Sequence, residues 1–286
     1  MGEVLLRDVV LHAAEKFASA GIDAAQVDAE LIAAHVLNFS RGEVQAAMLS
    51  GFELNEDQAK HYAEFSARRF AREPLQHITG SAYFRQLQLS VGRGVFVPRP
   101  ETETVVQIAI DELRSSKLAN PIAVDLGTGS GAIALAMHTE VDKAQVHAVE
   151  LSPDAFTYTS ANFERYPGAN LVLGDMADAF NALNGSVSVV ISNPPYIPVD
   201  MVPIDPEVHL FDPKLALYGG DDGLDLIRVV ATTASRLLIE GGLLVIEHAD
   251  TQSAAVCELL LAEGFDRVEA HKDLTGSDRA VSARKG

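Results

Sequence analysis

The chain has 286 residues, of which 48% are hydrophobic, enough to build a sizeable core in one or two domains. Its formal net charge of −18, from 40 acidic and 22 basic residues, argues against a broad phosphate-binding surface such as a nucleic-acid groove, and permits a basic protein partner. A single cysteine excludes a disulfide within one chain, which fits a reducing cytosol. The N-terminal stretch 1–21 has the pattern of an amphipathic helix rather than a signal peptide, and no apolar run is long enough to span a membrane. We therefore expect a cytoplasmic protein.

Residues 1 to about 73 are predicted to form a small bundle of helices, because apolar residues recur three or four positions apart. Pairs typical of capping boxes mark three helix starts: Asp23 with Gln26, Ser40 with Glu43, and Asn55 with Gln58. This segment contains no glycine-rich loop, and the nine histidines of the chain show no metal-ligand spacing, so we expect no structural metal. A purely structural bundle and a partner-docking domain fit the pattern equally well.

Residues 74–100 are predicted to form a linker with a β-hairpin. The stretch "LQLSV" (87–91) alternates apolar and polar residues, and "GRG" (92–94) then offers a turn before "VFV" (95–97). A helix is expected to start within "PRPETETVVQIAIDEL", with Pro100 in its first turn.

The rest of the chain, residues 101–286, alternates apolar runs with helical patterns, which is typical of a doubly wound, mostly parallel sheet. A short loop, "KDLTGSD", joins the last two strands and predicts an antiparallel hairpin at one end of the sheet. The seven expected strands are Ile122 to Leu126, Val146 to Glu150, Leu171 to Leu173, Val187 to Ser192, Leu243 to Glu247, Arg267 to His271 and Ala280 to Ala283.

A glycine-rich loop follows the first of these strands. Gly127, Gly129 and Gly131 alternate with Thr128 and Ser130 and lead into a helix. Glycine lets a ligand approach the backbone closely, and a helix N-terminus offers free N–H groups, although tight packing between strand and helix would need glycine too. The G-x-G-x-G spacing differs from the G-x-G-x-x-G of dinucleotide-binding folds, and it favours S-adenosylmethionine over NAD.

Acidic residues lie at the ends of successive strands. Asp125 precedes the glycine loop, Glu150 ends the next strand, and Asp175 follows the third. Open α/β sheets bind ligands at the carboxyl ends of their strands, where Glu150 can accept both ribose hydroxyls and Asp175 can reach an adenine amino group. Each acid could also be a solvated strand end, and only their joint placement indicates a nucleoside site.

The tetrapeptide Asn193-Pro194-Pro195-Tyr196 ends the fourth strand, since proline cannot donate to a sheet. A planar NH₂ nitrogen attacks poorly because its lone pair is delocalised. The Asn193 side-chain oxygen and the Pro194 carbonyl could accept hydrogen bonds from its two N–H groups, and these bonds would strengthen as positive charge develops on nitrogen. The prolines would keep the acceptors aimed, and the Tyr196 ring could stack on the flat group. The alternative is a strand-ending turn with an ordinary tyrosine.

Taken with "GTGSG" and "NPPY", the stretches "PLQHITG", "VPRPETE", "ALYGGDDGLDLI" and "DLTGSDRAV" resemble those of the bacterial release factor glutamine methyltransferase family (PrmC, also called HemK). The resemblance implies a class I S-adenosylmethionine-dependent methyltransferase that modifies the glutamine of the Gly-Gly-Gln motif in peptide chain release factors. It also implies a helical first domain that docks the release factor. The sequence departs from the family at "EHADTQ" (247–252), where His248 and Ala249 replace Ile-Gly, and at Glu150, where Asp is common.

Site residues follow from the resemblance, position by position. The donor would be bound by the glycine loop and Glu150, with Met176, next to Asp175, flanking the adenine, and with Asn193 bordering both ligands. The substrate glutamine would be held by Asn193, Pro194, Pro195 and Tyr196, with Phe96 and Arg99 lining the site from the linker side.

Three other functions compete with this interpretation. A DNA adenine methyltransferase could use the same tetrapeptide, but it would need a basic groove that a charge of −18 does not suggest. A non-enzymatic adaptor could keep a vestigial methyltransferase fold, but it would have no need of an intact "NPPY". NAD-dependent redox chemistry is disfavoured by the glycine spacing.

Overall fold

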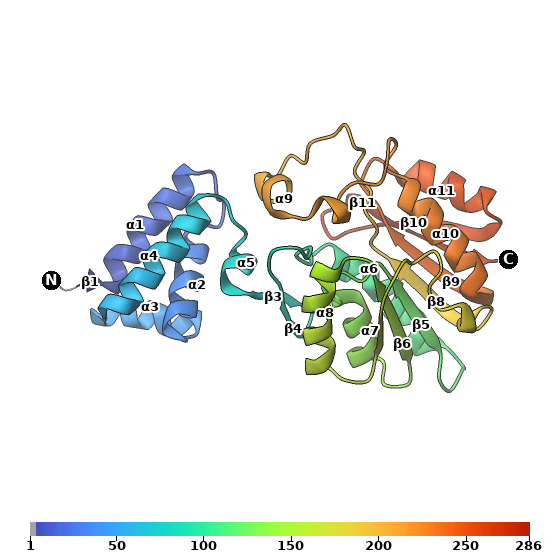
Figure 1. Ribbon diagram of the computed structural model, residues 1–286, viewed down its shortest axis with the longest axis horizontal. Coiled ribbons are helices and arrows are strands. Elements are labelled where there is room, and N and C mark those ends of the chain that lie inside the picture. The colour runs from blue at the N-terminus through green and yellow to red at the C-terminus, as the bar shows by residue number, and fades with distance from the viewer. Residues whose placement is uncertain (1–3) are drawn as a thin grey trace. The chain divides into compact units, whose positions relative to one another are not determined.

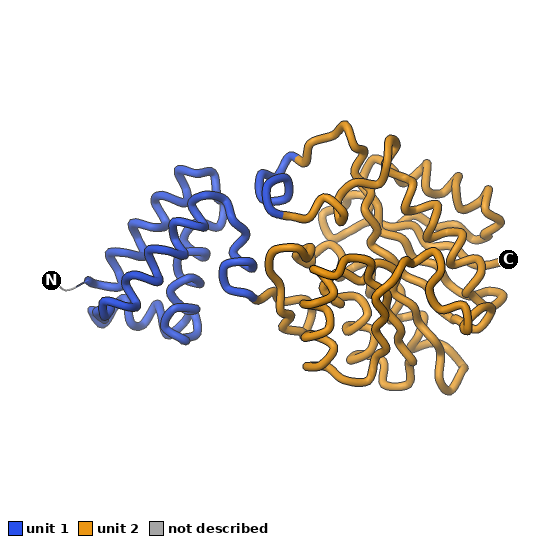
Figure 2. Tube along the Cα trace, in the orientation of Figure 1, with its two compact units in different colours: residues 1–80, 204–211 blue, residues 81–203, 212–286 orange. Residues whose placement is uncertain are grey.

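The computed structural model describes residues 4–286, so the first three residues of the predicted N-terminal helix lie outside the described chain. Contacts within the chain define two units (Figure 2). One contains the chain up to Gly80 together with Ile204–Phe211, and the other contains Ser81–Pro203 with Asp212–Gly286. We call them the helical unit and the catalytic unit.

The helical unit packs its helices around an apolar core that includes Phe17, Ile32 and Val44. Two of the three expected capping boxes are confirmed, at Ser40 and at Asn55. The one at Asp23 is wrong, because the helix is capped by Ala24 without a side-chain bond. The elements are β1 (Val4–Leu5), α1 (Leu6–Ser19), α2 (Ala25–Leu37), α3 (Arg41–Ser50), β2 (Glu53–Leu54), α4 (Glu56–Phe70), α5 (Leu75–Thr79) and α9 (Pro206–Phe211).

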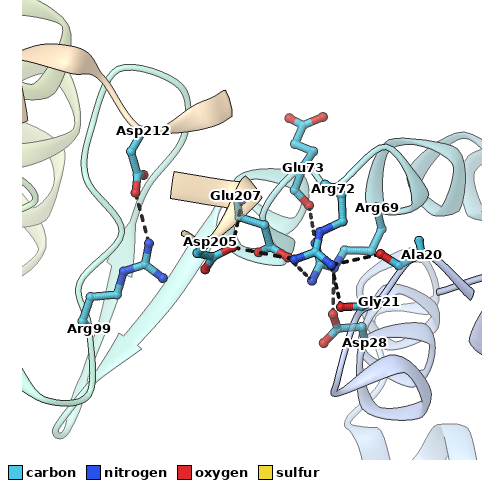
Figure 3. A network of polar contacts seen from close by, with 10 residues as sticks. All are labelled: Ala20, Gly21, Asp28, Arg69, Arg72, Glu73, Arg99, Asp205, Glu207 and Asp212. Atoms are coloured by element: carbon cyan, nitrogen blue, oxygen red, sulfur yellow. Dashed lines mark hydrogen bonds and ion pairs between the residues drawn. The ribbon is translucent and has the colours of Figure 1, made fainter. Parts of the chain in front are cut away.

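Helix α9 belongs to the helical unit although it follows the Asn-Pro-Pro-Tyr tetrapeptide in sequence. Arg69 of α4 joins it to the bundle through ion pairs to Asp28 and to Glu207, both at 2.7 Å (Figure 3). Arg72 adds ion pairs to Glu207 at 3.3 Å and to Asp205 at 3.7 Å. The chain therefore leaves the catalytic unit after the tetrapeptide, is fastened to the helical bundle by two arginines, and returns.

The catalytic unit has the predicted α/β architecture, and its strands and helices alternate as expected. Its elements are β3 (Ser81–Phe84), β4 (Leu87–Ser90), α6 (Thr102–Ser115), β5 (Ile122–Leu126), α7 (Ala132–Glu140), β6 (Gln145–Glu150), α8 (Pro153–Arg165), β7 (Asn170–Leu173), β8 (Val187–Ser192), α10 (Asp225–Leu237), β9 (Leu238–Glu247), α11 (Ser253–Ala262), β10 (Phe265–Lys272) and β11 (Asp278–Lys285), with short 3₁₀ turns at Asn181–Leu183 and Lys214–Ala216.

Seven strands form one sheet in the order β10-β11-β9-β8-β5-β6-β7, parallel except at the end that carries β10 and β11. Helices α6 and α7 pack on one face through residues such as Val189 and Val245, while α10 and α11 cover the other through Val190 and Leu244 (Figure 1). The order of the parallel strands reverses between β5 and β8. That switch point is where open α/β sheets bind ligands, and it is where the chain carries the glycine loop and the tetrapeptide.

The linker hairpin exists, but the predicted pairing is wrong. Strand β4, within "LQLSV", pairs backward with β3 (Ser81–Phe84) and not forward with "VFV". Arg85 makes the tight turn with a positive φ of 52°, a conformation uncommon for a residue other than glycine. The "GRG" turn predicted from its glycines lies outside the hairpin. Helix α6 begins at Thr102, two residues after Pro100.

Candidate active site

The glycine loop between β5 and α7 leaves its backbone open on one side. Gly127 and Gly129 have φ values of +74° and +56°, and a Cβ added to either would meet nothing within 4 Å. Gly131 differs, because a Cβ there would lie 2.9 Å from Cε2 of Phe163. The first two glycines therefore keep space for a ligand next to the backbone, whereas the third permits close helix packing.

Asp125 supports the loop from beneath. Its Oδ2 atom accepts hydrogen bonds from the Thr128 hydroxyl at 2.6 Å and from the Ala134 N–H at 3.1 Å. Complete burial raises the pKa of the Asp125 carboxyl to about 7, while these bonds oppose the rise. Asp125 thus fixes the loop to the start of α7, and its predicted contact with the donor stays a prediction.

Glu150 lies at the end of β6, beside the loop. Its two carboxylate oxygens accept hydrogen bonds from the N–H groups of Gly129 and Ser152, each at 2.8 Å. A carboxylate has about four lone-pair positions, so two remain for ribose hydroxyls. The carboxylate is thus held in a fixed position next to the open backbone, as a ribose-binding group requires.

Helix α8 holds the loop from the side, which the sequence analysis did not foresee. The Asn162 side-chain amide donates to the Ser130 carbonyl at 2.9 Å, and the Thr159 hydroxyl donates to the Gly129 carbonyl. Both side chains are fully buried. Their pattern is that of ordinary polar residues on an amphipathic helix, so no sequence signal distinguished them.

Asp175 and Met176 follow β7, the edge strand on this side. Asp175 is exposed and accepts a hydrogen bond from the Ala177 N–H at 2.9 Å, and Met176 packs against an apolar cluster of the sheet. Both lie beyond the carboxyl end of their strand, and their contacts with adenine stay predictions.

The tetrapeptide Asn193–Tyr196 leaves β8 at the switch point, and we call it the acceptor corner. The hydroxyl of Ser192, the last residue of β8, donates to the carbonyl of Leu126, the last residue of β5, at 2.6 Å. This bond ties the start of the acceptor corner directly to the start of the glycine loop.

Two further segments hold the corner in place. Ile197 exchanges backbone hydrogen bonds with the "ALYGG" stretch, from its N–H to Leu217 at 2.8 Å and to its carbonyl from Gly219 at 2.9 Å. The Gln252 side chain donates to the Tyr196 carbonyl at 2.9 Å. Gln252 also accepts from the N–H of Ala249 at 3.0 Å, so the departure from the family at that residue leaves this contact intact.

Glycines of the "ALYGGDDGLDLI" stretch permit this close approach. A Cβ on Gly219 would lie 2.5 Å from the Pro195 carbonyl oxygen, and one on Gly223 would lie 2.3 Å from the Tyr196 carbonyl oxygen. Backbone cannot move aside as a flexible side chain can, so any larger residue would displace the corner.

The Asn193 side chain points its amide nitrogen at Thr102, the first residue of α6, whose hydroxyl accepts at 3.4 Å. Next to both lies Glu247, the last residue of β9, which is 1% exposed. Burial raises the pKa of the Glu247 carboxyl to about 7, and hydrogen bonds from Thr102 and Asn193 act in the opposite direction. Neither Thr102 nor Glu247 was predicted from the sequence. The signal for Glu247 was present, because β9 ends on a carboxylate just as β6 does.

Tyr196, Phe96 and Arg99 complete the predicted substrate side. The Tyr196 ring packs against an apolar cluster. Burial is the main cause that raises the pKa of its hydroxyl, and the negative charge of the nearby Glu247 carboxylate raises it further. The Arg99 guanidinium carbon lies 5.3 Å from the centre of the Phe96 ring, and its Nη2 donates to Asp212 at 3.0 Å (Figure 3). Arg99 and Phe96 therefore contact each other, and their role toward substrate stays a prediction.

Within 4–286 no group of three or more His, Cys, Asp or Glu side chains is placed to hold a metal ion. In the same part of the chain, no helix is both long and apolar enough to cross a membrane.

Comparisons with known proteins agree with this geometry. The PrmC N-terminal domain family matches residues 8–80, and the methyltransferase small domain family matches residues 92–201. The release factor glutamine methyltransferase of Streptomyces coelicolor is 48% identical to this chain over 98% of each protein. The 4-amino-L-phenylalanine/4-methylamino-L-phenylalanine methyltransferase of Streptomyces pristinaespiralis is 39% identical over 88% of this chain and 86% of that protein. A crystal structure of a methyltransferase from Pyrococcus furiosus shares the fold, with a TM-score of 0.51 at 20% identity over 78% of this chain and 99% of that one.

Proposed function

The chain belongs to the release factor glutamine methyltransferase family, and we propose that it methylates the side-chain amide nitrogen of the glutamine in the Gly-Gly-Gln motif of peptide chain release factors. The methyl donor is S-adenosylmethionine, and the reaction takes place in the cytoplasm. The proposal depends most on the 2.6 Å hydrogen bond from Ser192 to Leu126. This bond holds the glycine loop, which would bind the methyl donor, next to the acceptor corner, which would bind the substrate amide.

The glycine loop fits the donor. Gly127 and Gly129 leave open space beside their backbone, and Glu150 stands next to it with acceptor capacity to spare. When bound there, S-adenosylmethionine supplies an electrophilic methyl group on a positively charged sulfur. Thr128 and Ser130 hold their positions through Asp125 and Asn162, so the loop is rigid before the ligand arrives.

The acceptor corner fits a carboxamide nitrogen. Asn193 Oδ1 accepts one N–H of the glutamine amide, and the Pro194 carbonyl accepts the other. Both bonds gain strength as the nitrogen becomes positively charged, so they stabilise the transition state more than the ground state. The methylated nitrogen is strongly acidic until it loses a proton, so the transfer needs no dedicated base.

The helical unit is the docking domain for the release factor in this proposal. A net charge of −18 would attract a basic partner over long range. If docking contributes, kcat/KM for the full-length factor exceeds that for a short Gly-Gly-Gln peptide. Equal values would remove this role.

A free aromatic amine is the second candidate acceptor, because the relative from Streptomyces pristinaespiralis is named for acting on 4-amino-L-phenylalanine. Its aryl NH₂ group is nearly planar, because its lone pair is partly delocalised into the ring, so the same pair of acceptors would suit it. A DNA adenine acceptor is not favoured, given the relatives and the charge of −18.

The test is incubation of the purified chain with isotope-labelled S-adenosylmethionine and either a release factor, 4-amino-L-phenylalanine or duplex DNA, followed by mass mapping. We expect label on the Gly-Gly-Gln glutamine of the release factor. Label only on the aromatic amine or the DNA would reject the proposal.

A further inference from the structure

Glu247 lies beside Asn193 as a direct result of strand register. Ser192 of β8 pairs with Ile246 of β9. The residues that follow them, Asn193 just beyond β8 and Glu247 at the end of β9, therefore lie at the same level. Thr102, at the start of α6, completes the group from a third segment. The Oε2 atom of Glu247 is buried and has no hydrogen-bond partner. A buried acceptor without a partner is costly, so the fold tolerates Glu247 at this position at the expense of stability.

The chemistry of these three side chains is directional. An asparagine side chain has a donor end and an acceptor end, and rotation by half a turn exchanges them. An ionised carboxylate can only accept, so the end of Asn193 that faces it must be the NH₂ group. The hydroxyl of Thr102 accepts from the same group at 3.4 Å. The carbonyl end of Asn193 is then left for a ligand.

We propose that Glu247, assisted by Thr102, is a positioning residue that fixes the Asn193 side chain with its oxygen toward the substrate nitrogen. This inference rests on the proposed function of the acceptor corner and deepens it. Glu247 does not touch the substrate. It acts by excluding the reversed orientation of Asn193, in which the NH₂ group would face the N–H groups of the substrate and repel them.

The proposal makes activity depend on pH. Above about pH 7 Glu247 is ionised and can only accept, whereas below that value it is protonated and its O–H can donate to the Asn193 oxygen, which permits the reversed orientation. The charged and titratable groups around it are Arg279 of β11, Glu101 before α6, Tyr196 of the corner and its own neighbour His248. Burial lowers the pKa of His248 below its ordinary 6.5, so it stays neutral across this range. Turnover should therefore fall as pH decreases through about 7.

Glu247→Gln tests the assignment, because glutamine keeps the shape and can donate at every pH. The purified full-length variant should fold, since the change removes a buried charge. We expect kcat on a Gly-Gly-Gln peptide to fall at pH 8 by tenfold to about 100-fold, the scale of a small misplacement of a catalytic group. The affinity for S-adenosylmethionine should be unchanged, and the acidic limb near pH 7 should disappear. Glu240→Gln makes the same chemical change at the exposed opposite end of β9 and should leave all three quantities as in the unaltered chain.

A double-mutant cycle separates positioning from a general structural role. If Glu247 acts only through Asn193, then Glu247→Gln has no further effect on kcat in an Asn193→Ala background. Additive effects, or a kcat for Glu247→Gln within twofold of the unaltered chain, would overturn the proposal. Thr102→Val should cost less than Glu247→Gln, because the carboxylate still selects the NH₂ end.

An NMR measurement without substrate tests the role of Glu247 separately from the proposed function. The side-chain ¹⁵N signals of Asn193, identified by their loss in Asn193→Ala, should titrate near pH 7 in the unaltered chain and not in Glu247→Gln. Methylation of an aromatic amine in place of glutamine would reject the proposed function. The same double-mutant cycle, with kcat measured on that amine, would still test whether Glu247 positions Asn193. Asn193 signals that do not respond to Glu247 would overturn the positioning role whatever the substrate.

Discussion

Two buried carboxylates of the catalytic unit, Asp125 and Glu247, differ from the buried carboxylates of the helical unit in how they are partnered. In the helical unit, Asp28 pairs with Arg69 at 2.7 Å and Glu30 pairs with Arg41 at 2.6 Å. In the catalytic unit, Asp125 and Glu247 each have one carboxylate oxygen that is buried without a hydrogen-bond partner, and burial raises the pKa of both. Paired charges in the helical unit hold segments together. Asp125 and Glu247 lie near the carboxyl ends of β5 and β9, beside the candidate site, and each buried oxygen without a partner lowers stability there.

The largest change in stability should come from removing the cation that pairs with Asp28 in the helical unit. Arg69→Met should lower the free energy of unfolding of that unit by about 3–5 kcal/mol, because it leaves Asp28 buried with no cation beside it. Chemical denaturation followed by a probe on α4 measures this. Arg68→Met removes the more exposed pair with Glu73 one residue earlier, and should cost less than about 1 kcal/mol. Equal losses would show that burial of the pair does not matter.

Removing the Glu247 carboxylate from the catalytic unit should raise the free energy of unfolding, whereas removing Arg69 from the helical unit lowers it. The pKa of Glu247 in the folded chain, about 7, is above its ordinary value of 4.5, so its contribution to stability is present below pH 4.5 and is lost as pH rises through 7. Glu247→Gln lacks this loss and should gain up to about 3 kcal/mol relative to the unaltered chain between pH 4.5 and pH 8. Urea unfolding at both pH values measures the change. If the stability difference between Glu247→Gln and the unaltered chain did not vary with pH, ionisation of Glu247 would not destabilise the fold.

Asn193→Ala tests the acceptor corner itself. We expect kcat to fall by about 100-fold or more, as when one preorganised hydrogen-bonding group is lost from an active site. Donor affinity should change little, because the Gly127–Gly131 loop is held by other contacts. Single-turnover kinetics and calorimetry measure the two quantities. Turnover near that of the unaltered chain would refute the role of Asn193.

Glu150→Ala should have a smaller effect, confined to the donor. Loss of hydrogen bonds to a carboxylate should weaken S-adenosylmethionine binding by about tenfold to 100-fold. Asp142→Ala, on the exposed loop before β6, is the matched control and should leave the Kd unchanged. An unaltered Kd in Glu150→Ala would contradict the ribose assignment.

Much of the fold could be predicted because short stretches of sequence determine many of its strands and helices. The strands Ile122–Leu126 and Val187–Ser192 were predicted with the bounds that the structure shows, since a buried parallel strand is an apolar run between clear breakers. The final antiparallel hairpin was confirmed as well. The linker hairpin was mispaired because its turn uses Arg85 with a positive φ, which no residue-type rule predicts. Likewise, no periodicity in residues 204–211 indicates that Arg69, 138 residues away from Glu207, fastens them to the helical unit.

The candidate site likewise has residues that local sequence predicted and residues that only the folded sheet brings together. The glycine loop and Glu150 are close in sequence, and their spacing predicted that they lie together, as the 2.8 Å bond from Gly129 to Glu150 confirms. Their contacts with the donor stay predictions. The group of Thr102, Asn193 and Glu247 is assembled from three distant segments, and only the register of β8 with β9 brings two of them together. Asn193 was found through its motif, whereas the residues that orient it required the sheet.

The decisive experiment is a crystal structure of the chain with S-adenosylhomocysteine and a Gly-Gly-Gln peptide bound. We expect the glutamine amide nitrogen to lie within hydrogen-bonding distance of Asn193 Oδ1 and the Pro194 carbonyl, with the Asn193 nitrogen still directed at Thr102 and Glu247. A glutamine side chain bound away from the acceptor corner, or an Asn193 turned toward it with its nitrogen, would contradict the account.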